Sequence, residues 1–144
     1  TLSKAFGSLG GFASTSDDLK HWILNKGRSY VYSTAPPLPV IEASRASLKI
    51  GRDEPEIQET LWRHVERLGD ALDRDPDSPI VPVIFGDEES ALAASRELLE
   101  RGIHATAIRP PTVPEGTSRI RFALSAAHTD DDIDYLIEAL DDLL

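Results

Sequence analysis

A lysine near the start of the chain is the first residue whose surroundings suggest chemistry. Lys4 follows Ser3 and precedes a glycine-rich stretch, in which Gly7, Gly10 and Gly11 indicate a turn or a close backbone approach. A lysine amine forms a Schiff base with a carbonyl compound when burial or a neighbouring cation lowers its pKa. A solvated surface lysine is the commoner outcome for this residue type, so Lys4 needs further context.

Two arginines in the last third of the chain can provide an anion site. Arg119 and Arg121 alternate with Ile120 and Phe122, so in a strand they share one face, opposite the apolar one. Paired guanidinium groups bind carboxylates with defined geometry. Solvated surface arginines are also common, and the residues alone leave both interpretations open.

The remaining ionisable residues form no further group whose types and spacing suggest catalysis or metal binding. The sequence has no Cys, which excludes a disulfide, a thiolate metal site and a cysteine nucleophile, and it shows no metal-ligand spacing. Three scattered histidines are given no role (His21, His64 and His104), and His128 is expected to order the start of the last helix. The acidic run at the C-terminus is interpreted as a solvated helix face, with Asp130–Asp132 placed where negative charge suits a helix N-terminus.

Helices are expected to dominate the first half of the chain. Ser16 followed by two aspartates is a helix start signal, and Gly27 would end that helix. Residues 30–34 form a short β-prone run that two prolines stop. Further helices are expected over residues 40–50 and from Pro55 onward. The second carries an apolar stripe of residues three and four apart: Ile57, Leu61, Val65, Leu68 and Leu72.

The second half begins with a strand and a helix. Residues 80–85 are β-branched and apolar and predict a strand. Asp87 is expected to cap the following helix, and Gly102 is expected just past its end. Three leucines are predicted to face inward from this helix: Leu92, Leu98 and Leu99.

Two more strands and a helix complete the pattern. Residues 104–108 and 119–124 predict strands separated by a proline-rich loop, and alternation places Ile120, Phe122 and Leu124 on one face. Thr129 and Asp132 resemble a capping box at the start of the last helix. The order strand, helix, strand, strand, helix predicts a small sheet with helices packed on one face.

Composition narrows the class of protein. The chain has 144 residues with 40% hydrophobic and 28% charged content, which is ordinary for a soluble globular protein. A formal net charge of −10 argues against nonspecific binding to nucleic acid or to anionic membrane. The lack of Cys fits a reducing compartment, and a cytoplasmic protein is expected. The chain begins at Thr1 and contains no Met, so we expect a fragment.

Four collinear blocks of the sequence resemble one enzyme family. Residues 1–12 (TLSKAFGSLGGF), 32–37 (YSTAPP), 107–121 (AIRPPTVPEGTSRIR) and 125–129 (SAAHT) are similar, in this order, to segments of the α-oxoamine synthases. These are pyridoxal-phosphate enzymes, and the first block resembles their cofactor-lysine segment. The resemblance covers essentially the whole chain.

The resemblance implies an α/β fold, the C-terminal part of the aspartate-aminotransferase-like (fold type I) architecture. Residues 1–38 would form the C-terminal edge of the large cofactor-binding domain. Residues 39–76 would be a helical connector, and residues 77–144 a small C-terminal α+β domain. The family's ring-stacking His and the Asp that pairs with the pyridine nitrogen lie upstream of the lysine, outside this sequence.

The resemblance also implies contacts to the cofactor, pyridoxal 5'-phosphate. Lys4 would bind it through a Schiff base and then move protons at the substrate α-carbon. Thr1 would donate a hydrogen bond to the cofactor phosphate. Thr34 would reach the phosphate in the partner subunit of a homodimer. By residue type alone, Thr1 and Thr34 are better explained as ordinary strand or cap residues.

Substrate contacts follow from the third block. Arg121 matches the arginine that holds the carboxylate of the amino acid, and Thr112 matches a loop threonine that contacts substrate. Arg109 is close enough in sequence to assist with an anionic group. No metal is implied.

The form of the loop at residues 109–114 narrows the implied reaction. It is most similar to the biotin-pathway branch of the family, which implies a pyridoxal-phosphate-dependent acyltransferase. This enzyme would condense L-alanine with a pimeloyl thioester, with loss of CO2. The acyl carrier, coenzyme A or a carrier protein, stays open. Two alternatives remain: another α-oxoamine synthase that uses glycine or serine, and a non-catalytic folding or dimerisation module, since half of the active site is absent.

Overall fold

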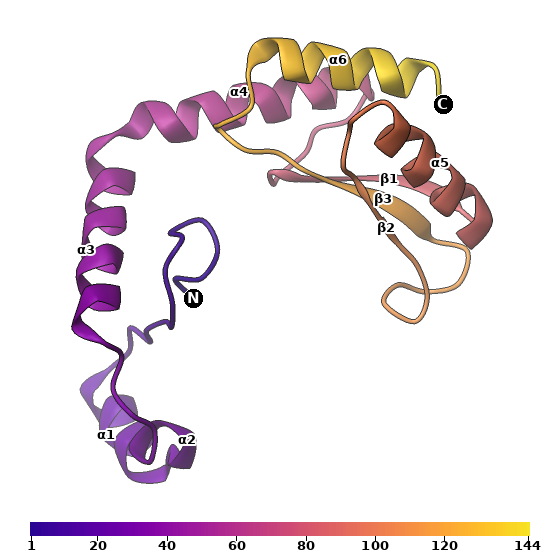
Figure 1. The fold of residues 1–144 in the computed structure, drawn as a ribbon. Helices are drawn as coiled ribbons and strands as arrows, with labels where there is room; N and C mark the ends of the chain where they lie inside the picture. The colour runs from indigo at the N-terminus through magenta and orange to yellow at the C-terminus, as the bar shows by residue number, and fades with distance from the viewer. The chain divides into compact units, whose positions relative to one another are not determined.

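The computed structural model describes all 144 residues, which form two compact units, Thr1–Pro55 and Glu56–Leu144 (Figure 1). Each unit is described by itself. The predicted connector is shared between them: α3 (Leu38–Asp53) belongs to the first unit and all but the first residue of α4 (Pro55–Ala71) to the second. The division into residues 1–38, 39–76 and 77–144 stays a prediction. No helix is both long and apolar enough to span a membrane.

The first unit consists of an N-terminal loop and three helices. Helix α1 (Asp17–Lys26) begins as predicted, since the Ser16 hydroxyl oxygen accepts a hydrogen bond from the Leu19 N–H at 3.4 Å. Gly27 ends it, also as predicted. The long helix α3 has Pro37 at its N-cap and covers the predicted helical residues 40–50 with a few more at each end.

The prediction of a short β-strand at residues 30–34 is wrong. A single helical turn, α2 (Arg28–Val31), lies there, and the N–H groups of Tyr30 and Val31 both donate to the Gly27 carbonyl at 3.0 Å. β-propensity measures how well side chains fit a pleated surface beside another strand. This unit contains no strand, so the local helical hydrogen bonds prevail.

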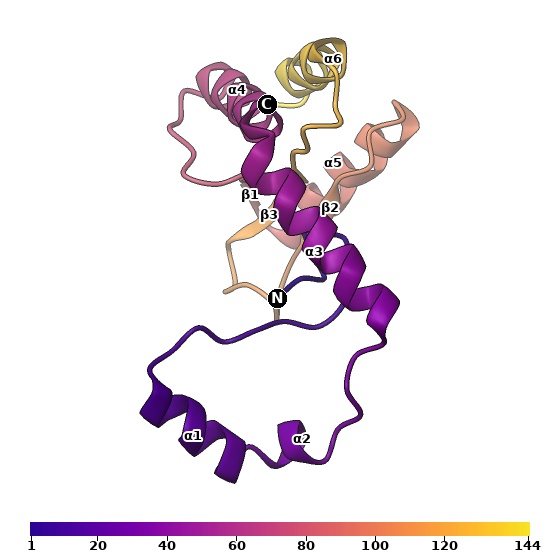
Figure 2. The ribbon, with the colours of Figure 1, turned by 90° about the vertical axis from the view of Figure 1, so that its left-hand side faces the viewer.

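A three-stranded antiparallel sheet organises the second unit. Its strands are β1 (Ile80–Gly86), β2 (Thr106–Ile108) and β3 (Ser118–Ala123), in the order β1-β3-β2. Three helices cover one face: α4, α5 (Glu88–Glu100) and α6 (Asp130–Asp141). Figures 1 and 2 show α4 and α6 side by side on this face. The predicted order of elements and the one-sided helix layer are confirmed.

The core of the second unit lies between the sheet and these helices. Its buried members come mainly from α4, β1, α5, β3 and α6, and they include Leu68, Val81, Leu98, Ile120 and Leu140. Two details of the predicted apolar faces are wrong. Leu99 is 58% exposed because Ala91, Ala94 and Leu98 form the inward face of α5. Ile57 is 43% exposed because the stripe of α4 is buried only from its middle onward.

Local signals at the helix ends behave as predicted. The Asp87 carboxylate accepts a hydrogen bond from the Ser90 N–H at 2.8 Å at the start of α5. Gly102, one residue past the C-cap of α5, has a φ of +81°, which suits glycine. Thr129 and Asp132 form a reciprocal capping box at the start of α6.

Candidate functional site

Lys4 lies on a tight turn of the N-terminal loop. The Gly7 N–H donates to the Lys4 carbonyl at 2.9 Å, and the Ser8 N–H donates to the Leu2 carbonyl at 2.9 Å. Gly7 adopts a φ of +56°, in the left-handed region that favours glycine. The backbone around Lys4 is therefore hydrogen-bonded on both sides, while its side chain is exposed to solvent.

Thr1 belongs to the same loop. Its hydroxyl donates to the Gly10 carbonyl at 3.2 Å and lies 2.8 Å from the Ser3 hydroxyl. Gly11 passes close by: a Cβ atom added to it would lie 3.3 Å from the Thr1 Cα. The sequence prediction placed Thr1 and Lys4 in one site, and the structure brings their backbones together in one closed loop.

Thr34 lies in the segment between α2 and α3. It is exposed, as are the neighbouring Tyr32 and Leu38, each of which has 75% of its surface accessible. Its side chain makes no hydrogen bond to the loop that carries Lys4. Within this unit, Thr34 is therefore an exposed residue in an exposed apolar segment.

Arg121 lies in the central strand of the sheet, on the face that the helices leave open. Its neighbours across the ladder are Pro82 on β1 and Thr106 on β2. Its side chain is exposed and forms no ion pair within the chain. Arg119 shares this face, and its Nε donates to the Thr117 carbonyl at 2.9 Å.

The open face also carries apolar surface. Ile80 and Ile84 of β1 are 52% and 50% exposed, and the register places Ile84 opposite Arg119. Side chains directly opposite in an antiparallel pair lie on the same face. The face therefore combines guanidinium groups with exposed aliphatic side chains, which suits an amphipathic anion.

The loop before β3 is fixed by contacts at its start and its end. Arg109 forms an ion pair with Glu88 at the beginning of α5, with 2.6 Å between Nη1 and Oε1. The Thr112 N–H donates to the Arg109 carbonyl at 3.0 Å, and the Thr117 hydroxyl donates to the Pro114 carbonyl at 2.7 Å. Thr112 itself is exposed. Sequence analysis missed Glu88, which is 21 positions from Arg109 and carries no local signal of the pairing.

The segment after β3 leads into the capping box of α6. His128 Nδ1 accepts a hydrogen bond from the Ser125 N–H at 3.2 Å, so it orders the helix start as predicted. The Thr129 N–H donates to the Asp132 carboxylate at 2.7 Å. This backbone hydrogen bond, together with the Thr129 hydroxyl, lowers the pKa of the Asp132 carboxyl below its ordinary value.

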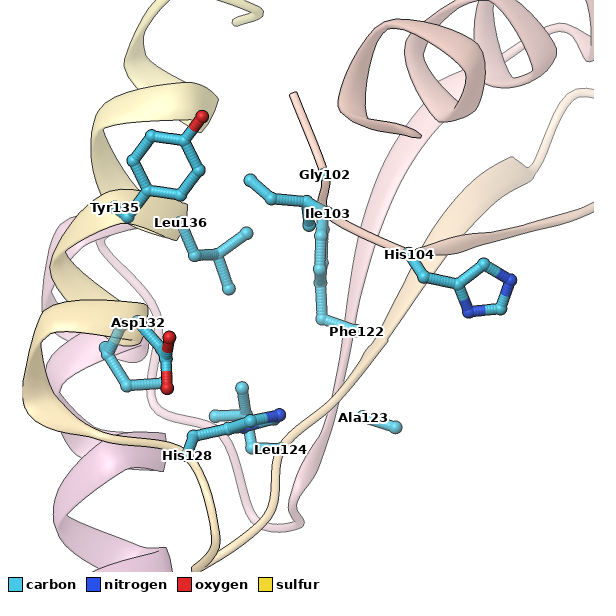
Figure 3. Close-up of a pocket in the computed structure, with 11 residues that line it drawn as sticks. Gly102, Ile103, His104, Phe122, Ala123, Leu124, His128, Asp132, Tyr135 and Leu136 are labelled. Carbon is cyan, nitrogen blue, oxygen red and sulfur yellow. The ribbon is translucent and has the colours of Figure 1, made fainter. Parts of the chain in front are cut away.

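A cavity of about 350 Å³ lies on the other side of the sheet, between α6 and the segment that enters β2 (Figure 3). Its walls combine apolar and polar side chains: Ile103, Phe122, Leu124 and Leu136 with His104, His128, Asp132 and Tyr135. None of the predicted site residues lines it. Phe122 faces the helices whereas Arg121 faces away from them, so the cavity is separate from the arginine face.

The structure thus groups the predicted site residues into three places. Thr1 and Lys4 share the N-terminal loop, and Thr34 lies in the exposed segment before α3. Arg109, Thr112 and Arg121 lie on β3 and on the loop between β2 and β3. These last three residues lie in one continuous segment of the chain, within the second unit.

Comparison with known proteins places this geometry in a family. The chain is 47% identical over 149 residues to the 8-amino-7-oxononanoate synthase of Methylococcus capsulatus, covering 99% of this chain and 38% of that protein. It is 44% identical to the Arabidopsis thaliana enzyme of the same name, covering 100% of this chain and 30% of that protein. The chain therefore spans about a third of the length of these curated relatives.

Solved structures match over nearly all of the chain. The serine palmitoyltransferase of Sphingomonas wittichii has a TM-score of 0.91 at 26% identity, covering 99% of this chain and 38% of that one. The 8-amino-7-oxononanoate synthase of Francisella tularensis has a TM-score of 0.80 at 26% identity, covering 99% and 42%. The predicted fold, the C-terminal part of the fold type I architecture, is confirmed.

The predicted cofactor and family are also confirmed. A serine palmitoyltransferase solved with pyridoxal phosphate as an internal aldimine matches with a TM-score of 0.91. Other serine palmitoyltransferase structures that match were also solved with pyridoxal phosphate. The model of aminotransferase class I and II matches residues 1–140. The chain belongs to the aminotransferase class I and II family, whose members depend on pyridoxal phosphate.

Proposed function

We propose that the protein containing this chain is an 8-amino-7-oxononanoate synthase. It would condense L-alanine with a pimeloyl thioester, with loss of CO2 and release of the free thiol carrier, in biotin biosynthesis. The observation that carries this proposal is the 42–47% identity, over 97–100% of the chain, to proteins with that name.

The N-terminal loop offers donors that fit part of pyridoxal phosphate. Lys4 supplies an exposed amine for the aldehyde. The Thr1 hydroxyl, which here donates to the Gly10 carbonyl, would turn to donate to the phosphate. The cofactor, when bound, withdraws electrons from the bond that reacts at the substrate α-carbon. Lys4 would then hold and move the proton at that carbon. Its defined backbone position supports this role, because proton transfer requires a fixed geometry.

The open sheet face would bind the substrates. Arg121 would hold the amino-acid carboxylate through its guanidinium fork, and Thr112 would contact substrate from the neighbouring loop. Arg109 would add positive charge for an anionic group, although Glu88 already pairs with it. The exposed Ile80 and Ile84 support binding of an aliphatic chain beside this charge.

Assembly and location are part of the same proposal. A homodimer would use the exposed segment around Thr34, where Tyr32 and Leu38 present apolar surface, and Thr34 would contact the partner's cofactor phosphate. The absence of Cys supports a reducing, cytoplasmic location. The acyl carrier, coenzyme A or a carrier protein, is not assigned.

A second candidate is a related synthase with a different amino acid. The serine palmitoyltransferase structures match with TM-scores of 0.89 to 0.92, above the 0.80 of the 8-amino-7-oxononanoate synthase structure. Their sequence identity of 26–28% is much lower than the 47% of the curated relative. Assays of the longer protein with alanine, glycine and serine against pimeloyl and palmitoyl thioesters distinguish the two. A preference for serine and the palmitoyl thioester would contradict the first proposal.

Lys4 provides the direct test of the cofactor role. Incubation of the chain with pyridoxal phosphate, borohydride reduction and peptide mapping should give an adduct at Lys4. Lys4→Ala should remove that adduct, and in the longer protein it should abolish turnover. Lys20→Ala, an exposed lysine on α1, is the matched control and should change neither. Normal turnover of the Lys4→Ala protein would overturn the proposal. An adduct missing from the chain alone would favour the non-catalytic module.

A further inference from the structure

A pair of serine side chains links the Lys4 loop to helix α3. We propose that Ser44, acting through Ser8, is a positioning residue that holds this loop, and with it Lys4, in place. The importance of the link for catalysis rests on the proposed function of Lys4, whereas its existence as a mechanical anchor does not.

The contact itself is short and partly buried. The hydroxyl oxygens of Ser8 and Ser44 lie 2.6 Å apart, although the two residues are 36 positions apart in sequence. The Ser44 hydroxyl donates to the Val40 carbonyl at 2.8 Å, one helical turn earlier. This leaves its oxygen free to accept from Ser8, whose hydroxyl also lies 3.3 Å from the Val40 carbonyl. Ser44 is 7% exposed and is the one buried polar residue of the first unit.

The burial of Ser44 distinguishes it from a surface serine. A serine in the middle of a helix ordinarily bonds back to the carbonyl four residues earlier or points to solvent. Ser44 bonds back and also receives a hydroxyl from a distant loop. Since a buried polar group without its partner costs free energy, the helix stabilises the loop conformation that brings Ser8 to it.

Backbone hydrogen bonds within the loop connect the anchored Ser8 to Lys4. The Ser8 N–H donates to the Leu2 carbonyl, and the Leu2 N–H donates to the Gly10 carbonyl, each at 2.9 Å. The Gly7 N–H closes the turn onto the Lys4 carbonyl, also at 2.9 Å. Residues 2–10 thus form one hydrogen-bonded loop, in which Lys4 lies within the segment closed by Leu2 and Ser8.

A second contact fixes the orientation of the loop. A Cβ atom added to Gly51 of α3 would lie 3.5 Å from the Phe6 ring, so Phe6 packs over this glycine. Leu2 is the only buried apolar residue of the first unit. The side chains of Leu2, Phe6 and Ser8 are thus at least partly buried, whereas Ser3, Lys4 and Ala5 are exposed. The anchored side chains hold the backbone while the Lys4 amine stays free to react.

With so few buried contacts, the loop should open locally without unfolding of the chain. Loss of the Ser44 hydroxyl should therefore raise the fraction of molecules in which this loop is open. In Ser44→Ala, hydrogen exchange of the Leu2, Gly7 and Ser8 amides should accelerate about fivefold, as expected for loss of one or two part-buried hydrogen bonds. Ser47→Ala is the matched control, since Ser47 lies one turn along the same helix and makes no side-chain hydrogen bond.

A double-mutant comparison separates the anchor from a general weakening of α3. Ser8→Ala should accelerate the exchange of the Leu2 and Gly7 amides by a similar factor. Adding it to Ser44→Ala should bring little further change, because both substitutions remove the same contact. Three results would each overturn the proposed anchor. They are unchanged amide exchange in Ser44→Ala, an equal acceleration of exchange in Ser47→Ala, and an acceleration in the double variant equal to the product of those in Ser8→Ala and Ser44→Ala.

The value of kcat distinguishes positioning of Lys4 from a purely structural role of Ser44, because a purely structural role would leave kcat unchanged. In the longer protein, Ser44→Ala should lower kcat about tenfold, because small displacements of a catalytic group cost this much or more. KM for the amino acid should not change, since Arg121, which would hold its carboxylate, belongs to the other compact unit and makes no part of this anchor. Faster exchange with an unchanged kcat would refute positioning but leave the role of Lys4 intact. If Lys4→Ala proves active, the proposed function fails, whereas the exchange data still decide the anchor.

Discussion

Truncation of Leu68 tests whether helix α4 belongs to the core of the C-terminal unit. Leu68 has no exposed surface and packs with side chains of β1, β3, α5 and α6. Leu68→Ala removes most of a buried side chain, whose transfer from water is worth about 2 kcal/mol. A residual cavity adds about 24 cal/mol for each Å³ that does not collapse. We therefore expect a loss of about 3 kcal/mol, a large part of the ~5–15 kcal/mol by which such domains are stable.

The assay is urea unfolding of the chain followed by far-ultraviolet circular dichroism. Ile57→Ala is the matched control on the same helix, because Ile57 is 43% exposed and should lose less than about 1 kcal/mol. In thermal unfolding, the Leu68 variant should melt more than about 12 °C lower, at about 4 °C or more per kcal/mol. Equal midpoints for the two variants would refute the reasoning. It would show that α4 is a separate connector, as the sequence suggested.

Two further predictions concern the capping residues at the starts of α5 and α6. Thr129→Ala removes the hydroxyl that accepts from the Asp132 N–H at 3.1 Å and should cost about 1 kcal/mol in the same urea titration, whereas Thr129→Ser should restore most of it. Acid should destabilise the chain because backbone hydrogen bonds from Thr129 and Ser90 lower the pKa of Asp132 and Asp87 in the folded state. Their contribution is complete above the unfolded pKa of about 3.9 and is lost as pH falls through the folded values. As the pH is lowered from about 4, the melting temperature of the chain should therefore decrease, and that of the Asp132→Asn variant should decrease less steeply. Equal dependence of the two melting temperatures on pH would contradict this linkage.

Local patterns were sufficient to predict most of the C-terminal unit. The helix starts at Asp87 and Thr129 and the glycine after α5 each depend on a few neighbouring residues. The alternation of Ile120 and Phe122 with arginines predicted which face of β3 is buried, since side chains in a strand point to opposite faces in turn. These features need no knowledge of distant residues.

Features that depend on distant residues were not predictable in the same way. Residues 30–34 have β-propensity, yet no strand lies beside them in the first unit, and α2 forms instead. The ion pair of Arg109 with Glu88 and the hydrogen bond of Ser8 with Ser44 join residues 21 and 36 positions apart. Nothing in the local sequence marks either partner.

The candidate site shows the same division. The exposed lysine on a glycine-rich turn could be described from the residues, but its role came from the resemblance of the four blocks to one family. The structure adds that Thr1 and Lys4 share one closed loop. It also shows that Arg109 already has an anionic partner, which the sequence did not suggest.

The central strand β3 couples the arginine face to the stability of the fold. Ile120 and Phe122 are buried, and Arg119 and Arg121 lie between and beside them on the other face. Because the side-chain period of a strand is two, a slip of one residue would bury both guanidinium groups and expose both core side chains. Burial of unpaired charge is costly, so the hydrophobic core fixes the direction of the arginines. An anion site on this face thus depends on the same packing that stabilises the unit, not on a separate set of residues.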